Sequence, residues 1–385
     1  MILLHISDTH LGKRQYNLDS REKDIYDAFQ QLIEVAINEH VDAVIHTGDL
    51  FDVSDPPVRV IHEAYKYLKK LKEKNIPFIS IPGDHDTPKR KGNIYPQFLL
   101  YELDLVKLLL DPLKPYVMNK GDVSLNIFGF RHFPNLAKDE LLKLLNSLKT
   151  QPNRNIIMLH QGFKEVLPYE GAWQLSFANL PKGFNYYACG HIHTRYMHKN
   201  NDGSVVAIAG SPDIMREEEI EGYLKNKKGA YLVDISKQEP TIQLINTDIR
   251  PQEVVELDTR GIDSTINELI AKYRSYSKKP ILHIVIKGEP IKRDLLYSKL
   301  QKLQEVTEHY RIYKDLTVMS KEDLKKLINN DVNNVNNINN LIINYLTKEY
   351  TYKFSEEDAK LVIELIENVD NDTKVEELIK KIAGV

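Results

Sequence analysis

Short apolar runs typical of buried β-strands alternate with amphipathic helical patterns through the first half of the 385-residue chain. Between residues 21 and 39, for example, Ile25, Phe29, Leu32 and Ala36 recur at helical spacing along one stripe. Such alternation is typical of βαβ units, whose helices pack against a buried sheet. We therefore predict strands and helices, in chain order, at Met1–Ser7, Arg21–Glu39, Val41–Thr47, Val58–Glu73 and Ile76–Ile81.

Shorter strand-like segments follow residue 115 and indicate a second sheet. With helices outside both sheets, the expected fold class is α/β, a four-layer α/β/β/α sandwich. The segments are Val123–Phe130, Asn155–Leu159, Asn185–Cys189, Val205–Ala209 and Ala230–Asp234.

The composition and the pattern of apolar residues change twice further along the chain, which predicts a division into three segments. Residues 1–250 would form the main domain. Residues 251–319, in which strand-like and helical patterns alternate, would form a small α/β domain. Residues 320–385 would form an asparagine-rich linker followed by helices.

The last part is too small to hold a core of its own. From Asn329 to Asn340, eight of the twelve residues are asparagine, a poor helix former, although the apolar spacing is helical. The segment Ser355–Asp358 then resembles a capping box that opens a helix. Either this tail packs on the main domain or its apolar faces meet another protein. The tether-like asparagine segment favours a partner protein.

Aspartate and histidine residues stand directly after the predicted strands. In open α/β sheets, ligands collect beyond the carboxyl ends of the strands. Residue type and position together therefore predict a metal site, because a single structural histidine is common but a whole series at strand ends is not. The candidate ligands are Asp8, His10, Asp49, Asp84, His160, His191 and His193.

The donor types narrow the metal and its chemistry. Imidazoles mixed with carboxylates suit Mn, Zn, Fe or Ni better than a Ca or Mg cage of oxygens. The single cysteine, Cys189, excludes both a thiolate zinc site and an intrachain disulfide, which favours a reducing cytosol. Because seven ligands are more than one ion needs, we expect two ions that share a carboxylate. Such pairs hydrolyse phosphate esters.

The residues that carry this pattern resemble a known family over roughly residues 1–235. The series Asp-x-His, Gly-Asp, Gly-Asp-His, His and Gly-His-x-His resembles the signature of calcineurin-like metallophosphoesterases. Four local sequences resemble those of SbcD-type nucleases of double-strand-break repair: Ile6–Gly12, His46–Phe51, Leu159–Gly162 and Tyr186–His193. This resemblance implies a nuclease core, a small capping domain and helices that bind an ATPase.

The resemblance also implies a role for each matching residue. Asp49 would bridge two Mn²⁺ ions, with Mg²⁺, Fe²⁺ or Zn²⁺ as alternatives. His85 would orient the scissile phosphate or protonate the leaving 3′ oxygen, since histidine titrates near neutral pH. Asp86 would either support an imidazole ligand from outside or cap a turn. One ion would be held by Asp8, His10 and His193, and the other by residue 84, His160 and His191.

Two positions depart from the family pattern. Asp84 stands where the family normally has asparagine. The added negative charge would tighten metal binding and make the ions weaker Lewis acids. Asp52 stands where relatives commonly have histidine, so no substrate-positioning role can be carried over to this position.

Basic residues near the predicted ligands are candidate DNA contacts, because cations there would neutralise backbone phosphates. The alternative is that these basic residues are ordinary solvent-exposed surface residues with no DNA contact. Net charge is −3, so nucleic-acid binding must come from local basic loops or from a partner. The candidates are Lys13, Arg14, Lys89, Arg90 and Lys91.

The leading prediction is a Mn²⁺-dependent DNA nuclease of double-strand-break repair. It would form a homodimer, bind a coiled-coil ABC ATPase through residues 320–385 and lie in the cytoplasm at the nucleoid. No apolar run approaches the roughly 20 residues needed to cross a bilayer. Two alternatives stay open. One is a two-metal phosphodiesterase for a small molecule or phosphoprotein, and the other is an architectural subunit attenuated by Asp84.

Overall fold

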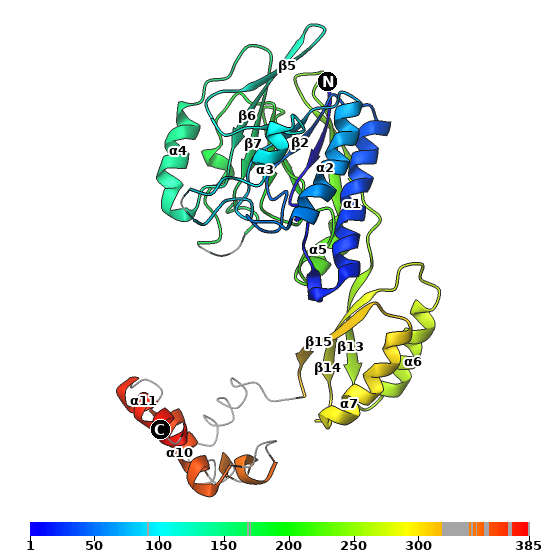
Figure 1. Cartoon of the computed structure of the whole chain (residues 1–385), viewed down its shortest axis with the longest axis vertical. Helices are drawn as coiled ribbons and strands as arrows, with labels where there is room; N and C mark the ends of the chain where they lie inside the picture. The colour runs from blue at the N-terminus through cyan, green and yellow to red at the C-terminus, as the bar shows by residue number, and fades with distance from the viewer. Residues whose placement is uncertain are drawn as a thin grey trace. The chain divides into compact units, whose positions relative to one another are not determined.

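The computed structural model describes residues 1–90, 92–167, 169, 171–317, 339, 342–343, 345–349, 354–368 and 372–383. The chain forms two compact units (Figure 1). The first contains residues 1–255, 266–284 and 300–311, and the remaining described residues belong to the second.

The first sheet is mixed and has the strand order β12-β11-β1-β2-β3-β4. The strands from β1 to β4 are parallel, and β11 and β12 add an antiparallel edge. Their bounds are β1 Ile2–Ile6, β2 Ala43–His46, β3 Phe78–Ser80, β4 Lys107–Leu108, β11 Gly229–Asp234 and β12 Thr241–Asn246.

Two long helices cover the outer face of this sheet. Figure 1 shows α1 and α2 side by side along it. Phe29 of α1 and Leu68 of α2 share one buried core with Leu4 and Val44 of the strands. Side chains alternate along a strand, and the residues on the opposite face, such as Leu3 and Ile45, are also apolar and buried. The helices on this side are α1 Asp19–Asn38, α2 Val58–Glu73 and the short α3 Gln97–Glu102.

The second sheet has the order β5-β6-β7-β8-β10-β9 and packs on the first. Leu3 and Ile45 of the first sheet are buried in one cluster with Ile127 and Met158 of the second. Helix α4 covers the far face, where Leu141 joins a separate core. The strands and helix are β5 Tyr116–Lys120, β6 Val123–Phe130, β7 Arg154–His160, β8 Tyr186–Gly190, β9 Tyr196–Lys199, β10 Val205–Ile208 and α4 Lys138–Ser147.

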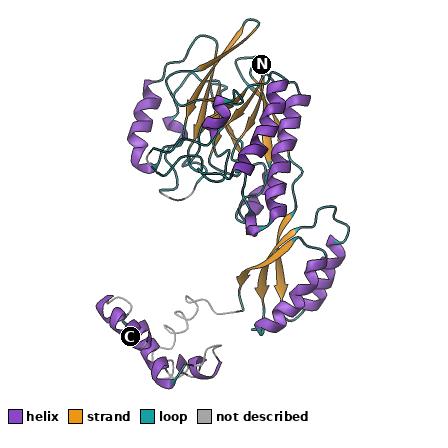
Figure 2. Ribbon diagram, viewed as in Figure 1, coloured by secondary structure: helices purple, strands orange, loops and turns teal. Residues whose placement is uncertain are grey.

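These cores separate four layers, as expected from the sequence, with the strands of both sheets between helices (Figure 2). The short helix α5 (Glu219–Asn226) precedes β11. The expected second sheet is confirmed, although the last predicted strand, Ala230–Asp234, belongs to the first sheet as β11.

Residues after 251 form a three-stranded sheet of order β13-β14-β15 with two helices. Strand and helix types follow the sequence patterns, but the boundaries of the three predicted domains stay a prediction. The elements are β13 Gln252–Asp258, α6 Ile262–Tyr273, β14 Ile281–Lys287, α7 Arg293–Leu300 and β15 His309–Asp315.

Two helices, α10 (Glu356–Glu367) and α11 (Asp372–Ala383), pack against each other near the end of the chain. Ser355 caps α10, since its Oγ accepts a hydrogen bond from the Asp358 amide at 3.0 Å. Apart from Asn339, the asparagine-rich segment lies outside the described residues. Among the helices that are described, none combines the length and apolarity that a membrane span requires.

Candidate metal centre

The predicted ligands meet at the carboxyl edge of the two sheets. Strands β1, β2 and β3 are parallel in one sheet, and β7 and β8 are parallel in the other. Their ends therefore point the same way within each sheet. His160 is the last residue of β7, and the other ligands follow their strands by one to four residues. The structure brings together Asp8, His10, Asp49, Asp84, His160, His191 and His193.

Asp8, His10 and His193, here called the Asp8 group, form one cluster of possible ligand atoms within 4.8 Å of one another. The two imidazoles face each other, with 3.1 Å between their Nε2 atoms. Asp8 Oδ1 lies 3.9 Å from the His193 Nε2 atom. All three side chains therefore present donors to one point.

Asp84, His160 and His191, here called the Asp84 group, form a second cluster together with His132. Asp84 Oδ1 lies 3.0 Å from Nε2 of His160 and 3.1 Å from Nδ1 of His191. His160 is oriented from behind, because its Nδ1–H donates to the Thr47 carbonyl at 2.7 Å. This leaves Nε2 of His160 free to face a cation.

Asp49 joins the two groups. Its Oδ2 lies 3.6 Å from Nε2 of His10 and 3.4 Å from Nε2 of His160. Burial raises the pKa of Asp49, but the charge and hydrogen bond of His160, together with the charge of His10, outweigh burial, and the pKa falls below its ordinary value. The Asp49 carboxylate therefore lies between the two groups.

The electrostatics of the site fit metal cations. Burial lowers the pKa of His160, yet Asp49 and Asp84 outweigh it and hold that pKa well above 6.5. Carboxylates that stabilise a proton at this point would equally stabilise a metal ion there. The donor set of imidazole nitrogens and carboxylate oxygens suits Mn, Fe or Zn, so the residues fit two such ions.

Four of the ligands have a backbone conformation that residues other than glycine rarely adopt. Their φ angles are 49° at Asp8, 44° at His10, 55° at Asp49 and 79° at His191. Hydrogen bonds hold this backbone in place, for example from the Asp8 amide to the Gly48 carbonyl at 3.0 Å. Such residues cluster where surrounding structure over-determines a functional geometry.

Glycines let the loops approach the ligands closely. A Cβ atom on Gly83 would overlap the carboxylate of Asp49, and one on Gly48 would overlap the His160 ring. Gly48 also has a φ of 101°, which favours glycine. The spacing of ligands therefore depends on the absence of these side chains.

His85 lies beside the ligands. Its amide donates to Asp49 Oδ1 at 2.9 Å, and its ring meets the His10 ring edge-on at 4.7 Å between centroids. The side chain is 30% exposed, so a substrate can reach it. This is a suitable place for a group that acts on substrate.

Asp86 is buried and accepts hydrogen bonds from the amides of Leu50, Phe51 and Gly83 at 3.0–3.1 Å. Its partners are backbone amides, which matches the turn-capping alternative and not a bond to an imidazole. Burial, followed by the charge of Asp49, raises the pKa of Asp86 to about 7. Asp86 ties the loops of Asp49 and Asp84 together.

The chain is related to known phosphoesterases and repair proteins. The family model of calcineurin-like phosphoesterases matches residues 1–195. The DNA double-strand break repair protein Mre11 of Saccharolobus solfataricus is 52% identical, over 100% of this chain and 99% of the relative. The chain belongs to the Mre11 family. Mre11 proteins of Sulfurisphaera tokodaii and Sulfolobus acidocaldarius are 50% and 49% identical, and each match covers 100% of this chain and 97% and 99% of the relative.

Membership in the Mre11 family confirms the resemblance seen in the sequence, and with it the sandwich fold and the enzyme class, a metal-dependent phosphodiesterase. Asp52, the second of the two departures from the family pattern, lies beside the centre. Its Oδ1 atom is 3.2 Å from His10 Nδ1 and 3.1 Å from Lys13 Nζ.

The predicted DNA contacts of this Mre11-family chain differ in their surroundings. Lys13 is paired with Asp52, and Arg14 lies 2.6 Å from Asp19. Lys89 and Arg90 are exposed next to the Asp84 loop. Lys91 lies outside the described residues.

Two residues of the centre were missed by the sequence analysis. His132 follows β6 and donates from Nδ1 to the His160 carbonyl at 3.2 Å. The strand-end rule that found the other histidines would have found it too. Glu219 lies 2.7 Å from Nδ1 of His193, but in the sequence it is only the last of three consecutive glutamates.

Proposed function

We propose that the chain is a Mn²⁺-dependent DNA nuclease subunit that acts in double-strand-break repair. The observation that carries the proposal is Asp49, whose carboxylate lies between two groups of ligands in a chain of the Mre11 family. When bound, two metal ions would supply positive charge to a phosphate and make a water molecule a stronger nucleophile.

The chain's own residues position the reaction. The Asp8 group and the Asp84 group would hold one ion each, with Asp49 between them. His85 stands at the exposed side of this centre and would move a proton at its Nε2 atom to the leaving 3′ oxygen. Mn²⁺ is preferred by analogy with the family, with Mg²⁺, Fe²⁺ or Zn²⁺ as alternatives, of which Fe²⁺ and Zn²⁺ suit the imidazole donors better than Mg²⁺ does.

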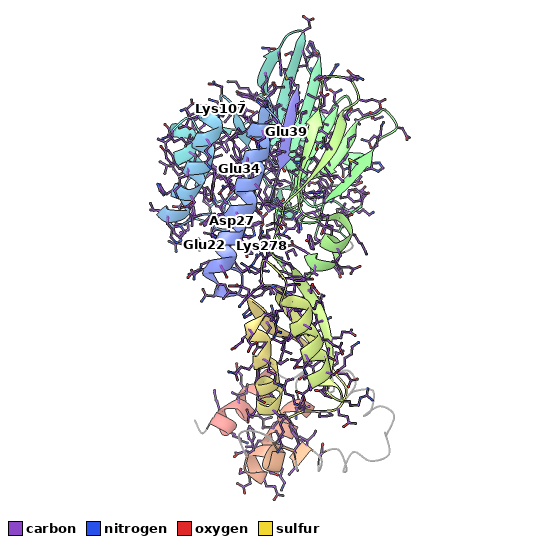
Figure 3. All side chains as sticks on the ribbon, turned by 90° about the vertical axis from the view of Figure 1, so that its right-hand side faces the viewer. Glu22, Asp27, Glu34, Glu39, Lys107 and Lys278 are labelled. Carbon is purple, nitrogen blue, oxygen red and sulfur yellow. The ribbon has the colours of Figure 1, made fainter. Side chains whose placement is uncertain are left out.

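Lys89 and Arg90 are the favoured contacts for flanking DNA phosphates. They are exposed and follow the Asp84 loop by a few residues. Lys13 and Arg14 already face carboxylates, so they offer less free charge. Helix α1 is an unsuitable path for DNA, since Asp27 and Glu34 lie along it and Glu39 follows its last residue (Figure 3). With DNA as substrate, the protein would act at the nucleoid.

Exposed apolar residues around α3 support the proposal of a homodimer. Large apolar side chains that are exposed close together in the chain are candidates for a protein–protein interface. We define the α3 surface as Ile94, Leu99, Tyr101 and Leu103, which are 66%, 52%, 46% and 46% exposed.

Helices α10 and α11 support the proposal that residues 320–385 bind a coiled-coil ABC ATPase. Leu378 and Ile363 are buried, while Ile366 and Ile379 remain 56% and 52% exposed. The outward apolar residues suit a helical partner.

The test is hydrolysis of end-labelled linear and hairpin DNA with added Mn²⁺. The unmodified chain should cut both, and Asp49→Ala should cut neither. Hydrolysis of bis-p-nitrophenyl phosphate without DNA cutting would contradict the nuclease and favour a small-molecule phosphodiesterase. DNA binding without hydrolysis of either substrate would favour an architectural subunit.

A further inference from the structure

Glu219 stands directly behind a ligand of the Asp8 group. Its Oε1 lies 2.7 Å from Nδ1 of His193, on the side of the ring that faces away from Asp8 and His10. Glu219 opens helix α5, 26 residues beyond His193, and is itself buried. A buried carboxylate needs compensating charge or hydrogen bonds.

Lys228 supplies that charge from the residue before β11. It is 2% exposed and its ammonium donates to Glu219 Oε2. The same group donates to the Ser211 hydroxyl at 2.7 Å and to the carbonyl of His193 at 2.9 Å. All three donor positions of Lys228 are therefore used within the protein, so the pair is not a surface ion pair.

This arrangement fixes the protonation site of His193. A carboxylate accepts, so the His193 ring must carry a proton on Nδ1 and can leave its Nε2 atom unprotonated. That Nε2 faces Nε2 of His10 at 3.1 Å. Two unprotonated nitrogens at this distance repel each other unless a proton or a metal cation lies between them.

The Asp84 group is built differently. His160 is oriented by a neutral acceptor, the carbonyl of Thr47, at 2.7 Å. The Nδ1 atom of His191 faces Asp84, a member of the group itself. A buried carboxylate–lysine pair behind an imidazole is thus found at one group and not at the other within the described residues.

We propose that Glu219 is a positioning residue for His193, and that the Glu219–Lys228 pair sets the affinity of the ion held by the Asp8 group without affecting the other ion. The inference deepens the proposed two-metal function and rests on it. Removing such an outer partner typically weakens metal binding by about 10–100-fold.

The experiment is calorimetric titration of the full metal-free chain with Mn²⁺, without DNA. The double variant Glu219→Gln with Lys228→Met removes both charges together, so neither is left buried alone. One of the two binding steps should weaken by about 10–100-fold and the other should stay unchanged. His193→Ala should lose the same step, which identifies it.

Glu221→Gln is the matched control, since Glu221 lies on the same helix and is 80% exposed. Unchanged affinity for both ions in the double variant would overturn the inference, as would equal weakening of both. If the unmodified chain binds no Mn²⁺, the proposed function itself fails, which is a separate result.

A second measurement tests the positioning of His193 even if the double variant does not fold. Long-range ¹⁵N–¹H NMR of the unmodified, metal-free chain, labelled at histidine, reports which ring nitrogen of His193 is protonated. A proton on Nδ1 is expected. A neutral ring with its proton on Nε2 would overturn the inference.

Discussion

The Nδ1–H group of His85 donates a hydrogen bond to the backbone carbonyl of Asp52 at 2.7 Å. A carbonyl oxygen only accepts, so the Nδ1 proton is fixed whatever the charge on the ring. Proton exchange with substrate is thereby left to Nε2. The loop that carries Asp52 thus orients the residue proposed to assist the leaving oxygen.

Replacement of His85 by alanine should lower the rate of DNA cleavage by about 10²–10⁴-fold, because proton transfer to the leaving oxygen is lost. Mn²⁺ binding should persist, since His85 belongs to neither ligand group. Cleavage of labelled DNA and calorimetric Mn²⁺ titration check both points. Cleavage at the unmodified rate would remove His85 from the proposed mechanism.

Asp84→Asn should keep or raise DNA cleavage and weaken Mn²⁺ binding. The amide oxygen can still face His160 and His191, but one negative charge is removed from the centre. We expect roughly tenfold weaker binding, equal to about 1.4 kcal/mol. Cleavage at saturating Mn²⁺ separates the two effects. A cleavage rate well below that of the unmodified chain at saturation would show that the carboxylate is required.

Neutralising Lys89 and Arg90 together by glutamine should weaken DNA binding and reduce its dependence on salt. Each lost phosphate contact should lower the slope of log affinity against log salt by about one. Lys69→Gln with Lys70→Gln, on the exposed side of α2, is the matched control. Equal effects of the two pairs would indicate unspecific electrostatics.

Leu99→Glu on the α3 surface should convert a dimer into a monomer, because the charge would be buried in an apolar interface. Light scattering coupled to gel filtration measures the mass. Leu295→Glu on α7 is a matched control, since Leu295 is 50% and Leu99 is 52% exposed. A dimer that survives Leu99→Glu would exclude this face as the interface.

His5 should make the metal-free chain less stable in acid. Burial lowers the pKa of His5 from 6.5 to about 3, so below 6.5 the unfolded chain binds a proton that the folded chain does not. The stability that neutral His5 contributes is fully present above pH 6.5 and is lost as the pH falls towards 3. The free energy of unfolding should therefore fall by about 2 kcal/mol between pH 7 and pH 5 because of His5 alone.

Replacing His5 by glutamine should remove that part of the pH dependence. Urea unfolding of the metal-free chain at both pH values gives the difference, and the exposed His62→Gln is the control. A pH dependence equal to that of the unmodified chain would contradict the neutral state of folded His5.

The positions of the ligands could be predicted because strand ends are legible in a sequence. His160 ends an apolar run, and Asp49 and His191 each follow a glycine that ends one. Parallel strands then bring such residues together without any further information. Apolar runs also predicted the strands of the two sheets, because a strand that is buried on both faces is apolar along its whole length.

The supporting residues could not be predicted in this way. Glu219 meets His193 through a tertiary contact across 26 residues, and nothing local distinguishes Glu219 from the neighbouring Glu217 and Glu218. Asp86 stands beside ligands in the sequence, yet its bonds go to backbone amides. Sequence position shows which residues lie near the centre, but hydrogen bonds decide what each one does.

At four ligands, the backbone conformation that places the side chain for metal binding lowers the stability of the folded chain. These ligands, with positive φ angles, are Asp8, His10, Asp49 and His191. Glycine would relieve the backbone at any of these positions, but it would delete a ligand. The metal-free chain therefore folds with conformational strain that selection for activity does not allow it to lose. Stabilising this protein by substitution at its sheet edge would remove its metal centre, whereas occupancy by metal stabilises the same backbone without changing a residue.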